Sequence, residues 1–124
     1  MNQNLLLMVD SYKVSIWKQY PPATDHVYSY IEARGGAWSH AVMFGLQAFL
    51  RAYLSQPITQ ANIDEAGEFF AAHGEPFNRA GWDYILRVHA GYLPLMIKAV
   101  DEGSVVALGN VLASVVNTDP SVFG

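Results

Sequence analysis

The chain has 124 residues, carries a net charge of −4 and contains no cysteine. This length is typical of one domain, and the lack of cysteine excludes disulfide frameworks, thiol nucleophiles and cysteine-ligated metal sites. The few basic residues are spread singly along an acidic chain, unlike the basic patch of a nucleic-acid-binding domain. Charged residues make up only 15% of the chain, whereas about 25% is typical. We therefore expect one globular domain, residues 1–124, with more apolar surface than it can bury alone.

This apolar excess indicates either a membrane or a surface that another polypeptide covers. The longest early apolar run, residues 5–9, ends at Asp10 and is far shorter than the roughly 18 residues of a membrane-spanning helix. No basic segment precedes the run, so it is not typical of a signal peptide. We expect a cytoplasmic protein without membrane contact, whose apolar face is covered by a partner.

The first predicted element is a helix over residues 11–19. Apolar and amphipathic side chains, among them Ile16 and Trp17, recur there at helical spacing. Ser11 is expected as the N-cap, and the proline pair that begins at Pro21 ends the helix.

Two strands are expected next. Aromatic and β-branched residues predict a strand over residues 26–33, and a shorter apolar run predicts another over residues 40–44. A glycine pair at 35 and 36 separates them, so the two strands are expected to form a hairpin.

The rest of the chain reads as helices followed by strands. Helices are expected over residues 46–54, 59–73 and 79–90, and strands over residues 93–100, 105–108 and 111–116. Residues 117–120 (NTDP) are typical of a turn. This order favours an α+β fold with an N-terminal helix, an antiparallel or mixed sheet and a central helical segment.

A dense polar cluster of Asp10, Ser11, Tyr12 and Lys13 begins the first helix. Free backbone N–H groups at a helix N-terminus favour anions, and a tyrosine ring can stack on a flat ligand. The same residues also suit a plain cap, in which Ser11 caps the helix and Asp10 complements its dipole. The residues alone leave both readings open.

Arg34 follows a predicted strand and precedes the glycine pair. A planar guanidinium beside a flexible loop suits bidentate phosphate binding. The alternative is a solvated surface arginine, paired with Glu32.

Generic catalytic signatures are absent from the sequence, which has no nucleophile elbow, dinucleotide-binding glycine motif, phosphate-binding loop or zinc-protease motif. The four histidines share no ligand spacing, so we expect no metal site in the chain. Aromatic residues at helical spacing are expected in the core, and acidic residues of the middle helix on a solvated face. These are Trp17, Tyr53, Trp82 and Tyr84, and Asp64, Glu65 and Glu68.

A series of short motifs runs in order along the chain. They are residues 10–22 (DSYKVSIWKQYPP), 27–36 (VYSYIEARGG), 44–47 (FGLQ), 77–82 (FNRAGW), 93–94 (LP), 97–100 (IKAV), 109–112 (GNVL) and 117–120 (NTDP). This ordered set resembles the N-terminal portion of the nicotinamide phosphoribosyltransferases, a type II phosphoribosyltransferase family, over essentially the whole chain.

The resemblance implies a pentosyltransferase of NAD salvage that makes nicotinamide mononucleotide and pyrophosphate from nicotinamide and phosphoribosyl pyrophosphate, the latter accompanied by magnesium. It implies a homodimer with active sites at the subunit interface. Carried over by motif, Tyr12 stacks on nicotinamide in the partner's site, Asp10 lies nearby and orients the base, and Arg34 binds phosphate or pyrophosphate. The catalytic residues belong to a larger α/β barrel outside this sequence, so we expect no catalytic residue or cofactor site here, and no activity from the chain alone.

Two alternatives stay open. The chain could be a free-standing binding or dimerisation module derived from such a domain. Its enzyme could also use nicotinate instead of nicotinamide. The DSYK and NTDP motifs favour nicotinamide, but the residues that select the base lie in the barrel.

Overall fold

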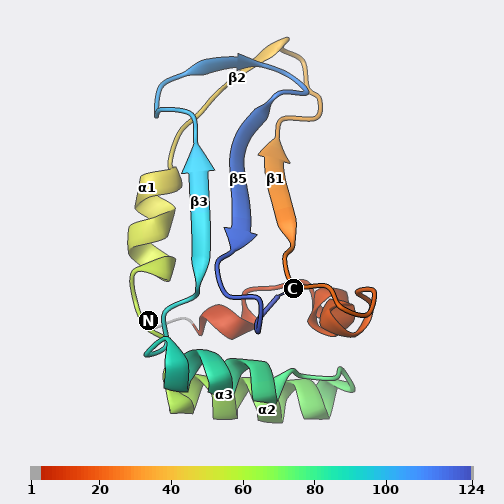
Figure 1. The fold of residues 1–124 in the computed structure, drawn as a ribbon. Helices are drawn as coiled ribbons and strands as arrows, with labels where there is room; N and C mark the ends of the chain where they lie inside the picture. Colours follow the sequence, from red (N-terminus) through yellow and green to blue (C-terminus); the bar gives the residue numbers. More distant parts are fainter. Residues whose placement is uncertain (1–3, 124) are drawn as a thin grey trace.

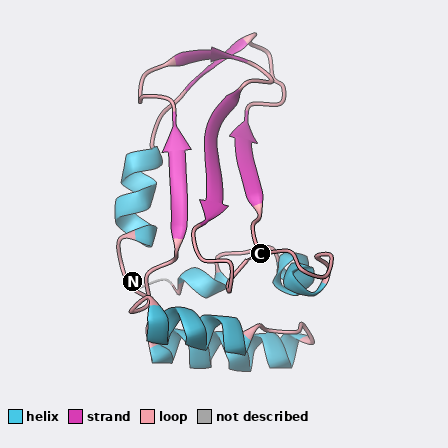
Figure 2. Cartoon of the chain, viewed as in Figure 1, coloured by secondary structure: helices cyan, strands magenta, loops and turns pink. Residues whose placement is uncertain are grey.

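In the computed structural model, which describes residues 4–123, a small antiparallel sheet stands on a layer of helices (Figures 1 and 2). The α+β class, the N-terminal helix and the central helical segment are confirmed. The helical elements are η1 (Leu5–Leu7), η2 (Ser11–Lys18), α1 (Leu46–Phe49), which continues as η3 (Leu50–Leu54), α2 (Gln60–His73) and α3 (Arg79–Val88). The strands are β1 (Tyr28–Glu32), β2 (His40–Val42), β3 (Leu95–Ala99), β4 (Val105–Ala107) and β5 (Val111–Asn117).

No helix in residues 4–123 combines the length and the apolar character that crossing a membrane requires. The two longest, α2 and α3, have 14 and 10 residues. Both lie across the end of the sheet at which β1 and β3 begin (Figure 1).

Strand β5 is the centre of the main sheet, which has the order β1-β5-β3. Tyr28 pairs with Val116 on one side, and Met96 pairs with Val116 on the other. The short strand β2 pairs instead with β4 in a separate two-stranded ribbon. The predicted hairpin between residues 26–33 and 40–44 is therefore wrong. The long, more deeply buried β5 takes β1 as its partner, and the loop with the glycine pair carries the chain out of the sheet to β2.

The first helix forms where predicted, but as a tight 3-10 helix. Its backbone bonds span three residues, as in the 2.9 Å bond from Lys13 N to Asp10 O. The Ser15 hydroxyl also donates to the carbonyl of Tyr12, the kind of local bond that competes with regular α-helix. Ser11 is the first helical residue, so the predicted Ser11 cap is wrong. Asp10 holds the N-cap position without a side-chain cap bond, because its carboxylate pairs with Lys13.

The main hydrophobic cluster lies in the helical layer. Its buried members are Leu6 from η1, Ile63, Ala66 and Phe70 from α2, Ile85 from α3, and Ile58 from the preceding loop. The approach of Ile58 to Gly91 is so close that a β-carbon at 91 would lie 2.3 Å from the Ile58 carbonyl oxygen. Trp82 packs against the cluster as predicted. Asp64, expected on a solvated face, is about half exposed and forms an ion pair with the equally exposed Arg79.

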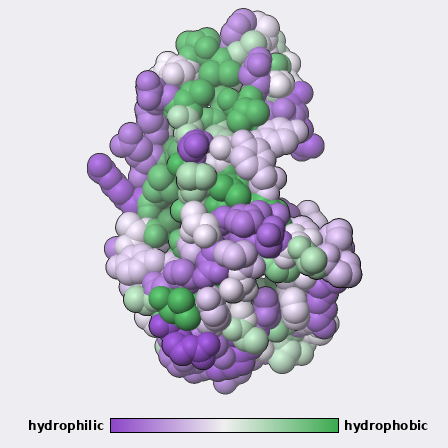
Figure 3. Space-filling view, in the orientation of Figure 1, coloured by the Kyte–Doolittle hydropathy of each residue, from purple (hydrophilic) through white to green (hydrophobic). Residues whose placement is uncertain are grey.

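The sheet and the ribbon leave large apolar side chains uncovered. Hydrophobic residues gather over this part of the molecule, and polar residues over much of the helical layer (Figure 3). The exposed side chains include Tyr28, Tyr30, Ile31, Trp38, Val42, Phe44, Val105 and Val111. The apolar excess of the sequence thus resides mainly on the strands and the loops beside them.

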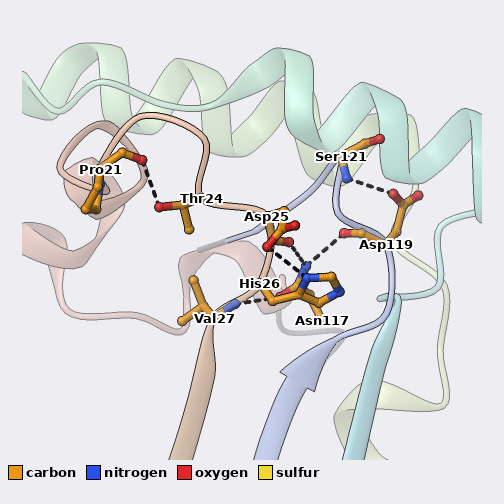
Figure 4. Close-up of polar contacts among 8 residues, drawn as sticks. All are labelled: Pro21, Thr24, Asp25, His26, Val27, Asn117, Asp119 and Ser121. Carbon is orange, nitrogen blue, oxygen red and sulfur yellow. Dashed lines mark hydrogen bonds and ion pairs between the residues drawn. The ribbon is translucent and has the colours of Figure 1, made fainter.

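The buried amide of Asn117 joins three parts of the chain at the end of β5 (Figure 4). Its oxygen accepts from the backbone N–H of Val27 at 2.8 Å. Its nitrogen donates to the carbonyls of Asp25 and Asp119, both at 2.8 Å. This side chain therefore fixes the start of β1 and the C-terminal turn relative to the central strand.

Replacing Asn117 by alanine should lower the free energy of unfolding by about 2 kcal/mol, since it removes three hydrogen bonds of a buried side chain, each worth about 0.5–1.5 kcal/mol. The matched control is Asn110→Ala, whose exposed amide makes one bond, to the carbonyl of Ala107. We expect a change within about 0.5 kcal/mol there. Urea unfolding followed by circular dichroism measures both; equal losses would contradict the role given to Asn117.

Candidate functional site

The cluster at the start of η2 presents an aromatic ring to solvent beside an ion pair. The Tyr12 side chain is 62% exposed. Asp10 Oδ2 lies 3.0 Å from Lys13 Nζ, and that ammonium lies 5.7 Å from the centroid of the Tyr12 ring. The hydrogen bond and charge of Asp10 raise the pKa of Lys13 above its ordinary value. The Tyr12 ring is thus largely open to solvent, and the Lys13 ammonium lies beside it.

Helix η2 is attached at its other end. The indole N–H of Trp17 donates to the carbonyl of Pro76 at 3.1 Å, which ties η2 to the loop between α2 and α3. The Tyr20 ring meets the edge of Phe123 with centroids 5.7 Å apart. These contacts hold the exposed Tyr12 on an element that the helical layer supports.

Arg34 is exposed just beyond the C-terminal end of β1. The neighbouring Ala33 carbonyl accepts from the N–H of Gly109 at 3.0 Å, which places this segment beside the turn between β4 and β5. Within residues 4–123, Arg34 makes no ion pair, so the pairing with Glu32 considered above does not form there. Its guanidinium is available to a ligand.

The structure does not bring Tyr12 and Arg34 together within one chain. Helix η2 adjoins the helical layer, whereas Arg34 follows the opposite end of β1, near the β2–β4 ribbon (Figure 1). The five residues of β1 alone span about 17 Å at 3.3–3.4 Å each. A ligand that contacts Tyr12 in one chain is therefore remote from Arg34 of the same chain.

One polar cluster, centred on Asp119, was not predicted from the sequence. The Asp119 carboxylate accepts from the N–H of Ser121 at 2.8 Å and the hydroxyl of Tyr84 at 3.1 Å, and lies 2.7 Å from His89 Nε2. The Ser121 amide, then His89, lowers the pKa of Asp119 to about 2. The sequence signal was limited to the NTDP turn, because His89 and Asp119 are 30 residues apart and only the fold joins them.

The described part of the chain offers no metal centre. Residues 4–123 contain no group of three or more histidine or acidic side chains that could hold an ion. The Asp119 cluster is occupied by internal bonds that join α3 to the C-terminal turn. Its role in the folded chain is structural.

The comparisons with known proteins agree with the motif order. The family described as "Nicotinamide phosphoribosyltransferase, N-terminal domain" matches residues 4–97. The chain belongs to this family. A nicotinamide phosphoribosyltransferase of Xanthomonas campestris pv. campestris is 50% identical over 97% of the chain and 26% of the relative's own length. One from Acinetobacter baylyi is 29% identical over 97% of the chain and 27% of the relative. The chain thus spans about a quarter of the length of these curated relatives.

Replacing Asp119 by asparagine should lower the melting temperature at neutral pH, with a gap from the parent chain that closes in acid. Because the folded pKa of Asp119 lies below its ordinary 3.8, its charge stabilises the fold above that pH, and this stabilisation is lost as the pH falls toward 2. Thermal unfolding across this range measures the gap. A gap independent of pH would contradict the assignment.

Proposed function

We propose that this chain is the substrate-binding N-terminal part of a nicotinamide phosphoribosyltransferase that forms nicotinamide mononucleotide and pyrophosphate in NAD salvage. The observation that carries the proposal is the exposed Tyr12 ring, held on η2 within the motif DSYK of a chain that belongs to this family. The nicotinamide ring is flat and aromatic, so an exposed ring on a supported helix is a suitable stacking surface.

Tyr12 and Asp10 act on the base without reacting. Stacking on Tyr12 holds the nicotinamide ring in line with the ribosyl carbon, and such positioning removes much of the entropic cost of the reaction. Asp10, paired with Lys13 at 3.0 Å, lies at the same helix start and orients the base. Neither side chain serves as nucleophile or general base, and the reacting groups come from the rest of the enzyme.

Arg34 binds the phosphate or pyrophosphate group of phosphoribosyl pyrophosphate. Its exposed guanidinium, without an ion pair in residues 4–123, matches phosphate oxygens in a bidentate manner. Magnesium belongs to this proposal only as a companion of the substrate's phosphates. The described residues lack a cluster that would hold it, so no step of the mechanism passes through a metal held by this chain.

The distance between the two residues supports a homodimer with shared sites. Nicotinamide and phosphoribosyl pyrophosphate that react together must lie side by side. They cannot contact Tyr12 and Arg34 of the same chain, because the length of β1 separates these two residues (Figure 1). Two chains arranged so that Tyr12 of one meets the phosphate site of the other remove this difficulty. The uncovered apolar side chains of the sheet give such an assembly a surface to bury. We also propose that the enzyme is located in the cytoplasm.

The purified chain alone should not turn over. Mixed with nicotinamide, phosphoribosyl pyrophosphate and magnesium, residues 1–124 should form no nicotinamide mononucleotide, because the chain holds none of the reacting groups. A sensitive assay of the mononucleotide by mass spectrometry checks this. Sustained turnover would refute the division of roles.

Substitutions in an active chimera separate the two binding roles. In the chimera, this chain replaces the matched segment of the Xanthomonas campestris relative. Tyr12→Ala should raise the KM for nicotinamide by about tenfold, equivalent to roughly 1.4 kcal/mol of lost stacking, and Tyr12→Phe should keep most of the affinity. Arg34→Ala should instead raise the KM for phosphoribosyl pyrophosphate by about tenfold or more.

Arg51→Ala is the control for loss of a surface charge, since Arg51 is an exposed arginine on η3. It should leave both KM values unchanged. If the Tyr12 and Arg34 variants change the KM of both substrates by small, equal amounts, the proposed binding roles are wrong. Tyr12 then belongs to a plain helix cap, and Arg34 is a solvated surface arginine. If the chimera prefers nicotinate to nicotinamide, only the proposed base is wrong, and the binding roles of Tyr12 and Arg34 stand.

A further inference from the structure

Helix η2, which carries Tyr12, has little along its own length to hold it in place. It is a 3-10 helix of eight residues, and none of them is fully buried. Helices of this type have poorer hydrogen-bond geometry than α-helices, and runs beyond three or four residues are uncommon. The N-cap residue Asp10 makes no side-chain cap bond. The position of the Tyr12 ring therefore depends on the contacts of η2 with the rest of the chain.

Within residues 4–123, one hydrogen bond joins η2 to a distant part of the chain. The indole N–H of Trp17 donates to the carbonyl of Pro76 at 3.1 Å, across 59 positions. Val14 and, just beyond the helix, Tyr20 add apolar contacts. Apolar contacts are non-directional and let a helix slide or turn, whereas a hydrogen bond weakens steeply when it is misaligned. The Trp17 bond is therefore the contact that sets where η2 lies.

The acceptor of this bond is itself fixed by the core. On one side of Pro76, the N–H of Glu75 donates to the carbonyl of Phe70 at 3.0 Å. On the other side, the ring of Phe77 stacks on that of Phe70, with centroids 5.9 Å apart. Phe70 is buried in the main hydrophobic cluster. The Pro76 carbonyl is thus a rigid point of attachment for η2.

The donor has a single partner and a fixed orientation. An indole carries one N–H and no acceptor, and the N–H of the half-buried Trp17 is used by Pro76. The Lys18 ammonium lies 5.3 Å from the centroid of the Trp17 ring, a cation–π arrangement that holds the ring from its face. Removal of the N–H alone therefore releases η2 from the helical layer.

A small tilt at Trp17 becomes a larger displacement at Tyr12. A 3-10 helix rises about 2.0 Å per residue, so the five residues from position 12 to position 17 span about 10 Å. Over that length a tilt of about 6° moves the ring by about 1 Å, and misplacement on this scale can cost about a hundredfold in rate. A side chain remote from the ligand thus decides where the stacking ring lies.

We propose that Trp17 is a positioning residue for the base site, whose hydrogen bond to Pro76 holds the Tyr12 ring where nicotinamide stacks. The inference rests on the proposed function, because it concerns the same ring. It adds a residue that touches no substrate and acts through Tyr12.

Kinetics of the active chimera test this role. Trp17→Phe keeps an aromatic ring and removes the donor, so it should raise the KM for nicotinamide by about three- to tenfold, the equivalent of one net hydrogen bond. The KM for phosphoribosyl pyrophosphate should stay within about twofold, since Arg34 lies beyond the far end of β1. The matched control is Trp38→Phe, the same exchange at a side chain that is 81% exposed. It should leave both KM values within about twofold.

A double substitution separates positioning from a general loss of structure. If Trp17 acts through the Tyr12 ring, the two effects are not additive, and Trp17→Phe should change the KM for nicotinamide by less than about twofold in a Tyr12→Ala background. An equal effect of Trp17→Phe with and without the ring would overturn the proposal. So would an unchanged KM in Trp17→Phe when Tyr12→Ala itself raises it.

Amide hydrogen exchange of the 124-residue chain tests the anchor without activity. Trp17→Phe should speed exchange of the Lys13 amide, which donates to the carbonyl of Asp10, by about three- to tenfold. Exchange of the Ile63 amide in α2 should not change. Equal Lys13 rates in parent and variant would overturn the proposal. If Tyr12→Ala leaves the KM for nicotinamide unchanged, the proposed function fails, and the exchange rates alone decide whether Trp17 holds η2.

Discussion

The amide of Asn117 is the constraint on which the rest of the arrangement depends. It stands at the end of the central strand, and its three hydrogen bonds reach the start of β1, the loop before it and the C-terminal turn. The loop that passes through Asp25 also leads back to η2, so the position of the Tyr12 helix is set from two directions. One is this junction, and the other is the bond from Trp17 to Pro76.

The two halves of the molecule are stabilised differently. The helical layer holds most of the fully buried side chains, whereas the strands rely on their backbone ladders and on Ala113 in the centre of β5. Tyr12 is therefore attached to the half with its own core. Arg34 lies in the half whose surface is uncovered, where a second polypeptide would change its surroundings most.

Local chemistry made the helices predictable. Thr59 and Asn62 form a capping box at the start of α2, and Gly74 ends that helix with a φ of 84°. Asn78 caps α3, because its side chain accepts from the backbone N–H of Gly81. These signals lie within a few residues of one another, so the sequence displays them without knowledge of the fold.

Strand pairing and the site depended on longer-range information. Nothing near residues 26–33 indicates that their partner is β5, which lies far along the chain. The residues alone left a helix cap or a stacking ring open for the cluster around Tyr12, and a surface or a phosphate-binding arginine open for Arg34. The resemblance to the family is what favoured ligand binding for both. Their separation by β1, and the meeting of His89 with Asp119, required the folded chain.

The partnership of β1 with β5 also sets an order of events during synthesis. Val27 and Asn117 are 90 positions apart, so β1 leaves the ribosome long before its neighbour exists. Meanwhile the helices, whose contacts are closer in sequence, can already assemble. During that interval the aromatic strand has both edges unpaired, a state prone to aggregation. The nascent chain is thus vulnerable in the period before β5 emerges.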